Sequence, residues 1–333
     1  MNQSESQGLN PSLARCSVSH HNGAMSAATT PRRVGYIGLG NLGFHLAHSL
    51  LKAGHTLTVT DINKELAEPL LAAGAQWADT AKGVAEASDV VFTCLPSPQV
   101  IDRVVTGPDG LLAGLAAGGT WIDNSTNDQE ETLRLAALCA EHGVRMLESP
   151  VTGGVHKAAA GDITVLVGGD EDLYEEHAEL LATIGNPVLH MGPLGSAAVI
   201  KVITNMLAFI HLVAAGEALM LAKRGGLDLT KSFEAILNSS GNSFVHETES
   251  QVILNGSYNI NFTMDLAVKD LGFAMEFGRR FGVPLDLAGS TMQTFIRARS
   301  QYGGSAWSSQ VVKLLEDALD TDLRAPGFPE ELQ

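Results

Sequence analysis

The chain has 333 residues, of which 45% are hydrophobic, 17% charged and 5% aromatic, and its formal net charge is -16. This length exceeds that of a typical compact domain, so we expect two domains, and the composition excludes a fibrous or largely disordered protein. No basic stretch interrupts the negative charge, which makes nucleic acid and anionic membranes poor partners, whereas a small anionic substrate still fits a locally cationic pocket.

The N-terminal segment, residues 1–31, is rich in Ser, Asn, Gly and Ala. It contains neither the apolar core of a signal peptide nor the arginines of a transit peptide, so we predict a disordered tail, with Met25 as an alternative start of the chain. Cys16, Cys94 and Cys139 are odd in number and lack the paired spacing of a metal or redox site. We therefore expect no metal and a reducing, cytoplasmic location.

From Val34 onward, short apolar runs alternate with amphipathic stretches such as Phe44–Ala53, Glu65–Ala73 and Glu130–His142. This alternation is typical of a doubly wound parallel sheet with helices on both faces, so we assign residues 32–193 to a Rossmann-type α/β domain. The runs predicted as strands are Val34–Leu39, Thr56–Thr60, Val90–Leu95, Thr120–Asp123, Val144–Leu147, Ile163–Val167 and Pro187–His190.

The pattern changes after Gly192-Pro193-Leu194-Gly195, because Ser196 to Arg224 continues as a helix with almost no breaker. We predict a long interdomain helix that leads into an all-helical domain over residues 194–320, which serves substrate binding and dimerisation, and then a tail over residues 321–333. The longest apolar run, Val202 to Ala215, is interrupted by polar residues, so no membrane span is expected. The further predicted helices are Leu229–Asn238, Asp265–Phe281, Leu285–Tyr302 and Ser309–Ala318.

A glycine-rich turn follows the first predicted strand and opens the helix His45–Lys52. In the pattern G-x-G-x-x-G the first glycine allows a tight turn, the second lets the backbone approach a pyrophosphate, and the third lets the helix pack on the strand. Alone the pattern is compatible with an ordinary turn. Its position between strand and helix predicts a dinucleotide site, made by Gly38, Leu39, Gly40, Asn41, Leu42 and Gly43.

Two later positions extend the predicted cofactor site. Asp61 ends the second strand, close to the expected offset for an acid that binds the adenosine ribose and repels a 2′-phosphate, and Ile62 stands where an arginine could bind that phosphate. NAD is therefore the preferred cofactor, with NADP as the alternative; Asp61 also fits a helix cap. Leu95 and Pro96 follow another strand, where a cofactor contact and a simple strand-ending turn are both compatible with the sequence.

Lys201 places a charge inside an apolar helix, and Asn205 lies one turn further along the same face. Burial of an ammonium lowers its pKa toward the range in which it can exchange a proton with a substrate hydroxyl, while a lysine at the helix edge can instead extend its amine to solvent. The segment therefore allows either a catalytic or a merely structural lysine.

With these residues in place, the chain from Val34 to Asp317 resembles the β-hydroxyacid dehydrogenase family, which includes 3-hydroxyisobutyrate dehydrogenase and tartronate semialdehyde reductase. The motifs that carry the likeness occur in the family's order. They are Gly38-Leu39-Gly40-Asn41-Leu42-Gly43, Asp123-Asn124-Ser125-Thr126, Ser149-Pro150-Val151-Thr152-Gly153-Gly154, Gly192-Pro193-Leu194-Gly195 with Lys201 and Asn205, and Lys269-Asp270-Leu271-Gly272.

The resemblance implies an NAD-dependent enzyme that interconverts a small β-hydroxyacid and its semialdehyde or ketone, working as a homodimer or homotetramer. It implies that Lys201 is the general acid and base, that Asn205 assists it, and that Lys269 reaches both substrate and cofactor. Thr126 would contact the cofactor. The residues implied to hold the substrate are Ser125, Thr152, Gly153 and Gly154 together with Lys269. Without the family, Thr152-Gly153-Gly154 is an ordinary turn.

The chain departs from the family pattern at Leu42, where Met is common, at Gln129, where Pro is usual, and at Thr152, where Ser is more frequent. These changes leave the substrate open, and we expect residues near Gln129, Phe244 and His246 to choose among candidate acids. Four other functions are alternatives: a decarboxylating sugar-phosphate dehydrogenase, an imine reductase, an NADPH-preferring semialdehyde reductase and a non-catalytic dinucleotide-binding module. The presence of Lys201 disfavours the second and the fourth of these.

Overall fold

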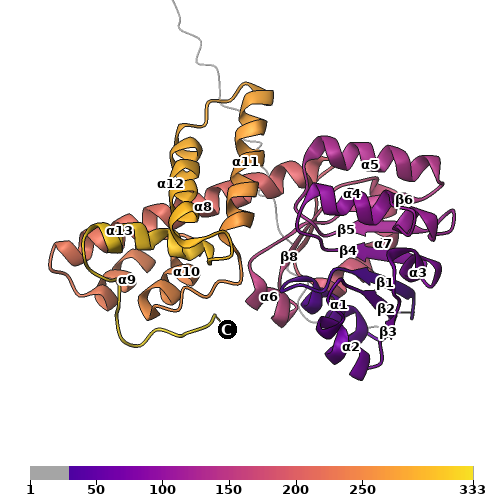
Figure 1. The fold of residues 1–333 in the computed structure, drawn as a ribbon, viewed down its shortest axis with the longest axis horizontal. Coiled ribbons are helices and arrows are strands. Elements are labelled where there is room, and N and C mark those ends of the chain that lie inside the picture. The colour runs from indigo at the N-terminus through magenta and orange to yellow at the C-terminus, as the bar shows by residue number, and fades with distance from the viewer. Residues whose placement is uncertain (1–29, 333) are drawn as a thin grey trace, which may run out of the picture. The chain divides into compact units, whose positions relative to one another are not determined.

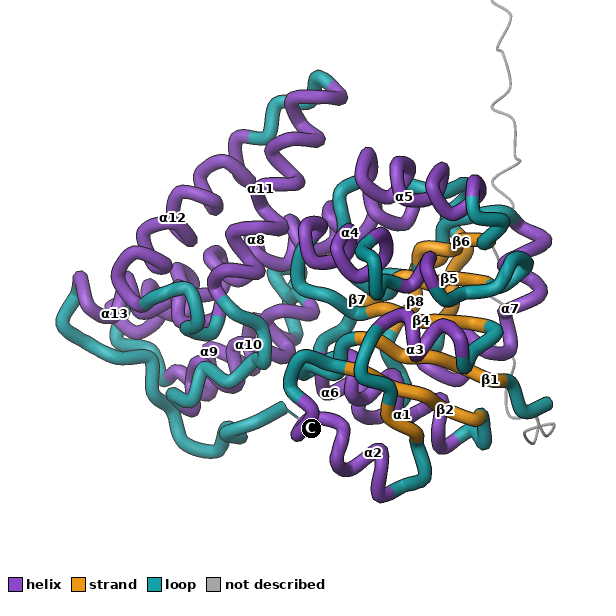
Figure 2. The backbone as a smooth tube through the Cα atoms, turned by 45° about the vertical axis from the view of Figure 1, so that its right-hand side comes forward, coloured by secondary structure: helices purple, strands orange, loops and turns teal. Residues whose placement is uncertain are grey.

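The computed structural model describes residues 30–332, so the tail predicted for residues 1–31 falls almost entirely outside the described part. Figure 1 shows that the strands belong to the first part of the chain and that helices alone follow from α8 (Ser196–Arg224) onward. In Figure 2 the orange strands gather in the same part, with purple helices around them. The predicted order of an α/β half followed by a helical half is therefore confirmed.

Six parallel strands form the larger sheet, in the order β3-β2-β1-β4-β5-β6. Because every pairing is parallel, all the carboxyl ends lie at one edge of the sheet. The strand order reverses direction between β1 and β4, which is the place where ligands bind in open α/β sheets. The strands are β1 (Arg33–Ile37), β2 (Thr56–Thr60), β3 (Gln76–Trp77), β4 (Val90–Thr93), β5 (Thr120–Asp123) and β6 (Arg145–Glu148).

Helices cover both faces of this sheet, as a doubly wound fold requires. Side chains alternate along each strand, so Phe92 packs in the core on one face while Val91 packs in the core on the other. The first face is covered by α1 (Gly43–Lys52), η1 (Lys64–Ala67), α2 (Glu68–Ala72), α6 (Val155–Ala160) and α7 (Glu171–Ile184). The second is covered by α3 (Ala81–Glu86), α4 (Pro98–Thr106), η2 (Leu111–Ala113) and α5 (Gln129–Glu141).

The last strands of this half form a sheet of their own, in the order β7-β8-β9. Here β7 (Val151–Thr152) runs antiparallel to β8 (Thr164–Val167), whereas β9 (Val188–His190) runs parallel to it. The sequence correctly predicted strands at Ile163–Val167 and Pro187–His190, but it placed them in the same sheet as the earlier strands. The chain turns back after β6, and the two-residue β7 is too short to show a strand pattern.

In the helical half, α8 contacts every other helix. The hydrophobic core around it contains Phe209, Leu219, Ile253, Leu271 and Phe295. The sequence predicted α8 over the same residues but missed α10, because His246 and Ser250 occupy buried positions and weaken its apolar pattern. The remaining elements are α9 (Leu229–Leu237), α10 (Phe244–Asn255), α11 (Met264–Phe281), α12 (Asp286–Tyr302), η3 (Ser308–Val312) and α13 (Lys313–Ala318).

The C-terminal residues, predicted as a tail, pack against this half. Leu323 is fully buried, and the Ala325 N–H donates to the Leu254 carbonyl at 3.0 Å. Arg324 donates to the Tyr258 hydroxyl at 2.8 Å and to the Glu316 carboxylate at 3.1 Å. Leu323, Arg324 and Ala325 thus hold this segment against α10 and α13.

Candidate active site

The glycine-rich turn joins β1 to α1 at the carboxyl edge of the larger sheet. Gly38 has φ +94°, and a Cβ there would lie 2.4 Å from the Cys94 carbonyl oxygen, so the turn itself requires glycine. A Cβ on Gly40 would meet no atom within 4 Å. The space in front of Gly40 fits a pyrophosphate that approaches the backbone, and α1 begins beside it without a side-chain cap.

These two glycines can be separated by experiment. We expect Gly40→Ala to fold with nearly normal stability but to lose about tenfold or more in NADH affinity, ~1.4 kcal/mol, because its Cβ enters the pyrophosphate space. Gly38→Ala is expected to lower the free energy of unfolding by about 1–3 kcal/mol through left-handed strain, and by more because its Cβ would clash with the Cys94 carbonyl oxygen. Urea unfolding and NADH fluorescence titration measure the two effects. Unchanged NADH affinity in Gly40→Ala would contradict the assignment of the turn.

Asp61 lies next to this turn. Its carboxylate accepts hydrogen bonds from the backbone N–H groups of Leu39 at 2.6 Å and Asn63 at 2.8 Å, which fix its position and leave lone pairs for ribose hydroxyls. The capping role considered for Asp61 belongs to Asn63, whose side chain accepts from the Glu65 N–H at the start of η1. Ile62 is fully exposed beside it.

The ends of β4 and β5 are joined by a buried polar network. The Ser125 hydroxyl accepts from the Leu95 N–H at 2.9 Å, while the Asp123 carboxylate accepts from the Ser125 N–H at 3.0 Å and from the Thr93 hydroxyl at 2.7 Å. Burial raises the pKa of Asp123, and the hydrogen bonds from Ser125 and Thr93 oppose that rise. The network holds Leu95, Ser125 and Thr126 together at the carboxyl edge. Sequence reasoning gave Thr93 and Asp123 no role.

Lys201 is buried, which contradicts the structural alternative of an amine that extends to solvent: only 8% of the residue is exposed. Its ammonium donates to the Asn205 side-chain oxygen at 2.8 Å, and the Asn205 amide donates to the Asp270 carboxylate at 2.6 Å. Burial lowers the pKa of Lys201 to about 8, with Asp270 opposing and Lys269 adding to that shift. Near neutral pH this amine can therefore both release and accept a proton.

Lys269 connects the two halves of the chain. From α11 its ammonium donates to the Thr126 carbonyl at 3.2 Å and lies 3.2 Å from the Asp270 carboxylate. The neighbouring Asn127 is buried, and its amide nitrogen has no hydrogen-bond partner among residues 30–332, as expected of a donor kept for a ligand. Asp270 was part of a recognised motif, but nothing in the sequence showed that it holds Asn205.

Glu148 is a further residue that sequence reasoning missed. It ends β6, and only 3% of the residue is exposed. Its carboxylate accepts hydrogen bonds from the N–H groups of Ala197 at 2.9 Å and Ala198 at 3.0 Å. Burial raises the pKa of Glu148 to about 7, and the two N–H groups oppose that rise. The carboxylate caps α8, so the position of Lys201 one turn later depends on it. The end of a predicted strand was the only signal in the sequence.

The turn Thr152-Gly153-Gly154 joins β7 to α6, and β7 contacts α8. Gly153 has φ +130° and Gly154 has φ +90°, conformations that glycine adopts without strain. Successive N–H groups in such a turn form a concave anion-binding surface. The structure thus brings this predicted substrate turn to the same helix that carries Lys201.

Two residues expected to choose the substrate have other contacts. His246 is buried, with 1% of the residue exposed. Its ring forms hydrogen bonds with the Phe233 carbonyl at 3.0 Å and the Ser250 hydroxyl at 3.1 Å, so both ring nitrogens already have partners inside the helical half. Gln129 packs against Gly195, where a Cβ would lie 2.9 Å from its Cγ. Phe244, in contrast, is 47% exposed. The expectation for His246 is therefore wrong.

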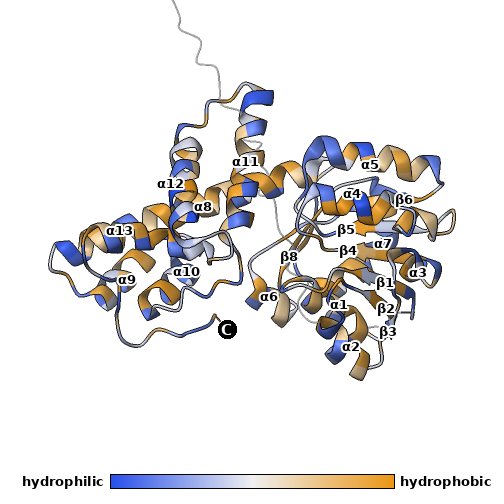
Figure 3. Cartoon of the chain, viewed as in Figure 1, coloured by the Kyte–Doolittle hydropathy of each residue, from blue (hydrophilic) through white to orange (hydrophobic). Residues whose placement is uncertain are grey.

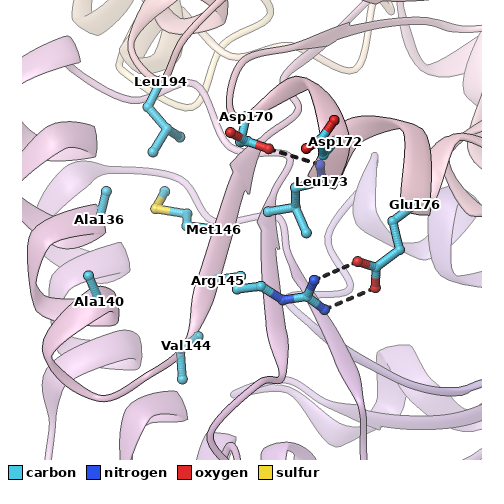
Figure 4. A pocket seen from close by; sticks show the side chains of 10 residues that line it. All are labelled: Ala136, Ala140, Val144, Arg145, Met146, Asp170, Asp172, Leu173, Glu176 and Leu194. Atoms are coloured by element: carbon cyan, nitrogen blue, oxygen red, sulfur yellow. Dashed lines mark hydrogen bonds and ion pairs between the residues drawn. The ribbon is translucent and has the colours of Figure 1, made fainter.

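A surface pocket lies away from these residues. It has a volume of about 440 Å³ and is lined mainly by residues of α5, β6 and the start of α7. Figure 4 shows these side chains, with the Arg145–Glu176 ion pair at one side. None of the predicted site residues lines it. The chemistry expected of the chain therefore has to be assigned to the carboxyl edge of the sheet and to α8, not to this pocket.

Comparisons with known proteins agree with this arrangement. A family model described as the NAD binding domain of 6-phosphogluconate dehydrogenase matches residues 33–192, and one described as NAD-binding of NADP-dependent 3-hydroxyisobutyrate dehydrogenase matches residues 195–315. A 2-(hydroxymethyl)glutarate dehydrogenase from Eubacterium barkeri is 35% identical over 285 residues, covering 85% of this chain and 95% of its own.

Two further relatives have names of the same kind. The mitochondrial 3-hydroxyisobutyrate dehydrogenase of Rattus norvegicus is 35% identical over 287 residues, which is 84% of each chain. The solved structure of a Mycobacterium tuberculosis 3-hydroxyisobutyrate dehydrogenase with L-serine is 28% identical, with a TM-score of 0.77, and the match covers 86% of this chain and 99% of that one.

Proposed function

This chain belongs to the β-hydroxyacid dehydrogenase family, and from that premise we propose that it is an NAD-dependent oxidoreductase that interconverts a small β-hydroxyacid and its semialdehyde or ketone. One observation carries the proposal: the buried Lys201 is held by Asn205 and Asp270 and has a pKa of about 8. A non-catalytic binding module has no need to maintain a buried lysine at this cost.

In the proposed oxidation, the neutral Lys201 amine accepts the proton of the substrate hydroxyl as the C–O bond becomes C=O; in the reduction, the ammonium returns it. Asn205 accepts one hydrogen bond from the amine, which directs the rest of the group toward the substrate. Asp270 fixes Asn205. Bound NAD supplies the hydride acceptor, a chemistry that no side chain of this protein provides.

For the substrate carboxylate we propose the turn Thr152-Gly153-Gly154, where two left-handed glycines present backbone N–H groups. Ser125 adds a hydroxyl at the end of β5, and Lys269 adds positive charge from the helical half. The cofactor assignments proposed for Thr126 and Lys269 rest on the bond between them at the same edge. Although the protein has a net negative charge, Lys269 thereby supplies local positive charge for an anionic substrate.

The proposed function is tested by a spectrophotometric screen of β-hydroxyacids with NAD and NADP in parallel. We expect at least one acid to be oxidised, with kcat/KM for NAD about tenfold or more above that for NADP, because Asp61 repels a 2′-phosphate and Ile62 offers no cation. Asp61→Ser with Ile62→Arg should reverse the preference. Equal rates with NADP in the wild type would contradict the role of Asp61.

Self-association is part of the proposal. Figure 3 shows hydrophobic residues along much of α8, which is long and apolar enough to cross a membrane, yet only 39% of its most apolar window is buried. The uncovered apolar residues include Ile203, Leu207 and Leu221, spaced to lie along one face of the helix. The opposite face holds the core and Lys201, so we propose that a second copy of this chain, not lipid, covers it.

We therefore expect light scattering to give a mass of two or more copies. Leu207→Glu should shift the protein toward the monomer, since a charge in an apolar interface costs about 2 kcal/mol or more. Leu189→Glu serves as the control because Leu189, on β9, is 44% exposed, as is Leu207. A monomeric wild type at micromolar concentration would refute the interface.

Two organisational proposals complete the assignment. We place the boundary between an α/β domain, residues 32–193, and a helical domain, residues 194–320, at the glycines before α8. The two family models meet between residues 192 and 195, which supports this boundary.

We also propose a cytoplasmic location, supported by the unpaired state of Cys94 and Cys139.

A further inference from the structure

Two side chains of α6 fold back over the turn that precedes it. A Cβ on Gly153 would lie 3.1 Å from Lys157 Cδ, and a Cβ on Gly154 would lie 3.0 Å from His156 Nδ1. The side chains of His156 and Lys157 therefore lie beside the turn to which the substrate carboxylate has been assigned.

The same two residues contact Phe244, at the start of α10 in the helical half. The rings of His156 and Phe244 stack with centroids 6.4 Å apart and an angle of 15° between their planes, and Lys157 Nζ lies 5.6 Å from the centre of the Phe244 ring. His156, Lys157 and Phe244 thus form a wall beside the substrate turn, which we call the α6–α10 wall.

Lys157 is the cation of this wall. Burial lowers the pKa of His156, and the charge of Lys157 lowers it further, so the imidazole is neutral at neutral pH. Phe244 adds only an aromatic face, which attracts the ammonium of Lys157 and leaves its N–H groups available to an anion.

The other two lysines of the site are already held by nearby acceptors. Lys201 donates to Asn205 at 2.8 Å, and Lys269 donates to the Thr126 carbonyl and pairs with Asp270. Lys157 has a weaker partner, because the carboxylate of Asp162 is 4.0 Å away and 61% exposed. Of these three cations, Lys157 is the one most free to pair with a ligand.

We propose that Lys157 is a specificity-determining residue that recognises a second carboxylate on the hydroxyacid, remote from the reacting hydroxyl, while Phe244 packs on the methylene groups between. The inference rests on the proposed function. The first carboxylate is assigned to the backbone of Gly153 and Gly154, whereas the Lys157 side chain passes beside Gly153 and places its ammonium against the Phe244 ring at the start of α10. A substrate that extends from the turn toward α10 would present its second carboxylate to this ammonium. The preferred substrate class is therefore a hydroxylated dicarboxylic acid.

The test uses two substrates that share the β-hydroxyacid group and differ on the carbon beside the carboxylate, one carrying a methyl and the other a carboxyethyl group. We expect the wild type to prefer the second. Lys157→Gln should lower kcat/KM for the dicarboxylate by about tenfold or more, mainly through KM, and leave the methyl compound within about twofold. Lys157→Arg should retain the preference because it retains the charge.

Lys313→Gln is the matched control, since Lys313 is also partly buried and lies 5.1 Å from an aromatic ring, that of Tyr302, within the helical half. In the wild type, added salt should reduce the dicarboxylate preference, which tests the charge without any substitution. A Lys157→Gln variant that loses the same factor with both substrates, or a preference insensitive to salt, would overturn the inference. If the wild type oxidises the methyl compound but shows no preference, this inference fails and the proposed function stands; if it oxidises no hydroxyacid at all, both fail.

Discussion

Lys201→Met is expected to lower kcat by about 10²- to 10⁴-fold, the contribution typical of a positioned general acid or base. Methionine keeps the length and apolar stem of the side chain, so the loss isolates the amine. NADH affinity should change little, because the proposed pyrophosphate and ribose contacts belong to the glycine turn and Asp61. Steady-state kinetics and NADH fluorescence titration separate the two effects.

The control for this variant lies on the same helix. Lys223→Met removes a lysine from the last turn of α8, where its ammonium pairs with Asp322. It should keep kcat within about threefold, since an exposed pair contributes about 1 kcal/mol or less to stability and nothing to proton transfer. An equal loss in both variants would show that Lys201 acts through the helix and not through its amine.

The pH dependence follows from the same amine. Oxidation requires neutral Lys201, and its pKa is lowered to about 8, so the rate of oxidation should rise as pH increases through that value. Reduction requires the ammonium and should fall over the same range. Lys201→Met should lose this dependence in both directions. A profile that is flat between pH 7 and pH 9, roughly one unit on either side, would contradict the assignment.

Glu148→Ala is expected to lower the free energy of unfolding by about 2–4 kcal/mol, because it leaves the buried N–H groups of Ala197 and Ala198 without an acceptor. It should also lower kcat, since α8 carries Lys201. Glu176→Ala provides the control: its carboxylate pairs with Arg145 at the surface, is 46% exposed, and should contribute about 1 kcal/mol or less. Urea unfolding measures both variants, and equal stabilities would remove Glu148 from this role.

Glu148 also predicts a pH effect on stability. Its pKa is raised to about 7 in the folded state from an ordinary value of 4.5, so between these values the folded chain binds more protons than the unfolded chain. The contribution of this group to stability is therefore lost as pH rises from 4.5 to 7. Glu148→Ala should remove that slope, and unfolding curves at several pH values in this window test it.

Much of the fold followed from local patterns. The turn at Gly38 could be predicted because a strand precedes it and a helix follows, and α8 because almost nothing interrupts Ser196 to Arg224. Lys201 stood out because charge is expensive in an apolar segment. These features are encoded within a few turns of one helix or a single strand.

The rest depends on contacts between distant residues. Glu148 accepts from Ala197 in the first turn of α8, 49 positions later in the sequence, and Asp270 binds Asn205 across 65 positions, which no local pattern records. His246 was expected near the substrate, whereas the Phe233 carbonyl and the Ser250 hydroxyl bind both of its ring nitrogens inside the core. The second sheet was missed for the same reason, since β7 and β8 pair across the whole of α6.

The hydrogen bonds from α8 to Glu148 also affect which parts of the chain could be exchanged between related enzymes. Most of the groups proposed to hold the cofactor, the glycine turn and Asp61 among them, precede Gly195, whereas Lys201 and Asn205, the groups proposed for proton transfer, follow it. If all residues after Gly195 were replaced by those of a relative, the protein would receive that relative's counterparts of Lys201 and Asn205. It would keep its own Asp61, and with it the proposed preference for NAD. Glu148 belongs to the retained N-terminal part and accepts hydrogen bonds from the first turn of α8, so it would position the exchanged helix. A recombinant without this carboxylate would contain both parts but would lose the contact that aligns α8 with the sheet.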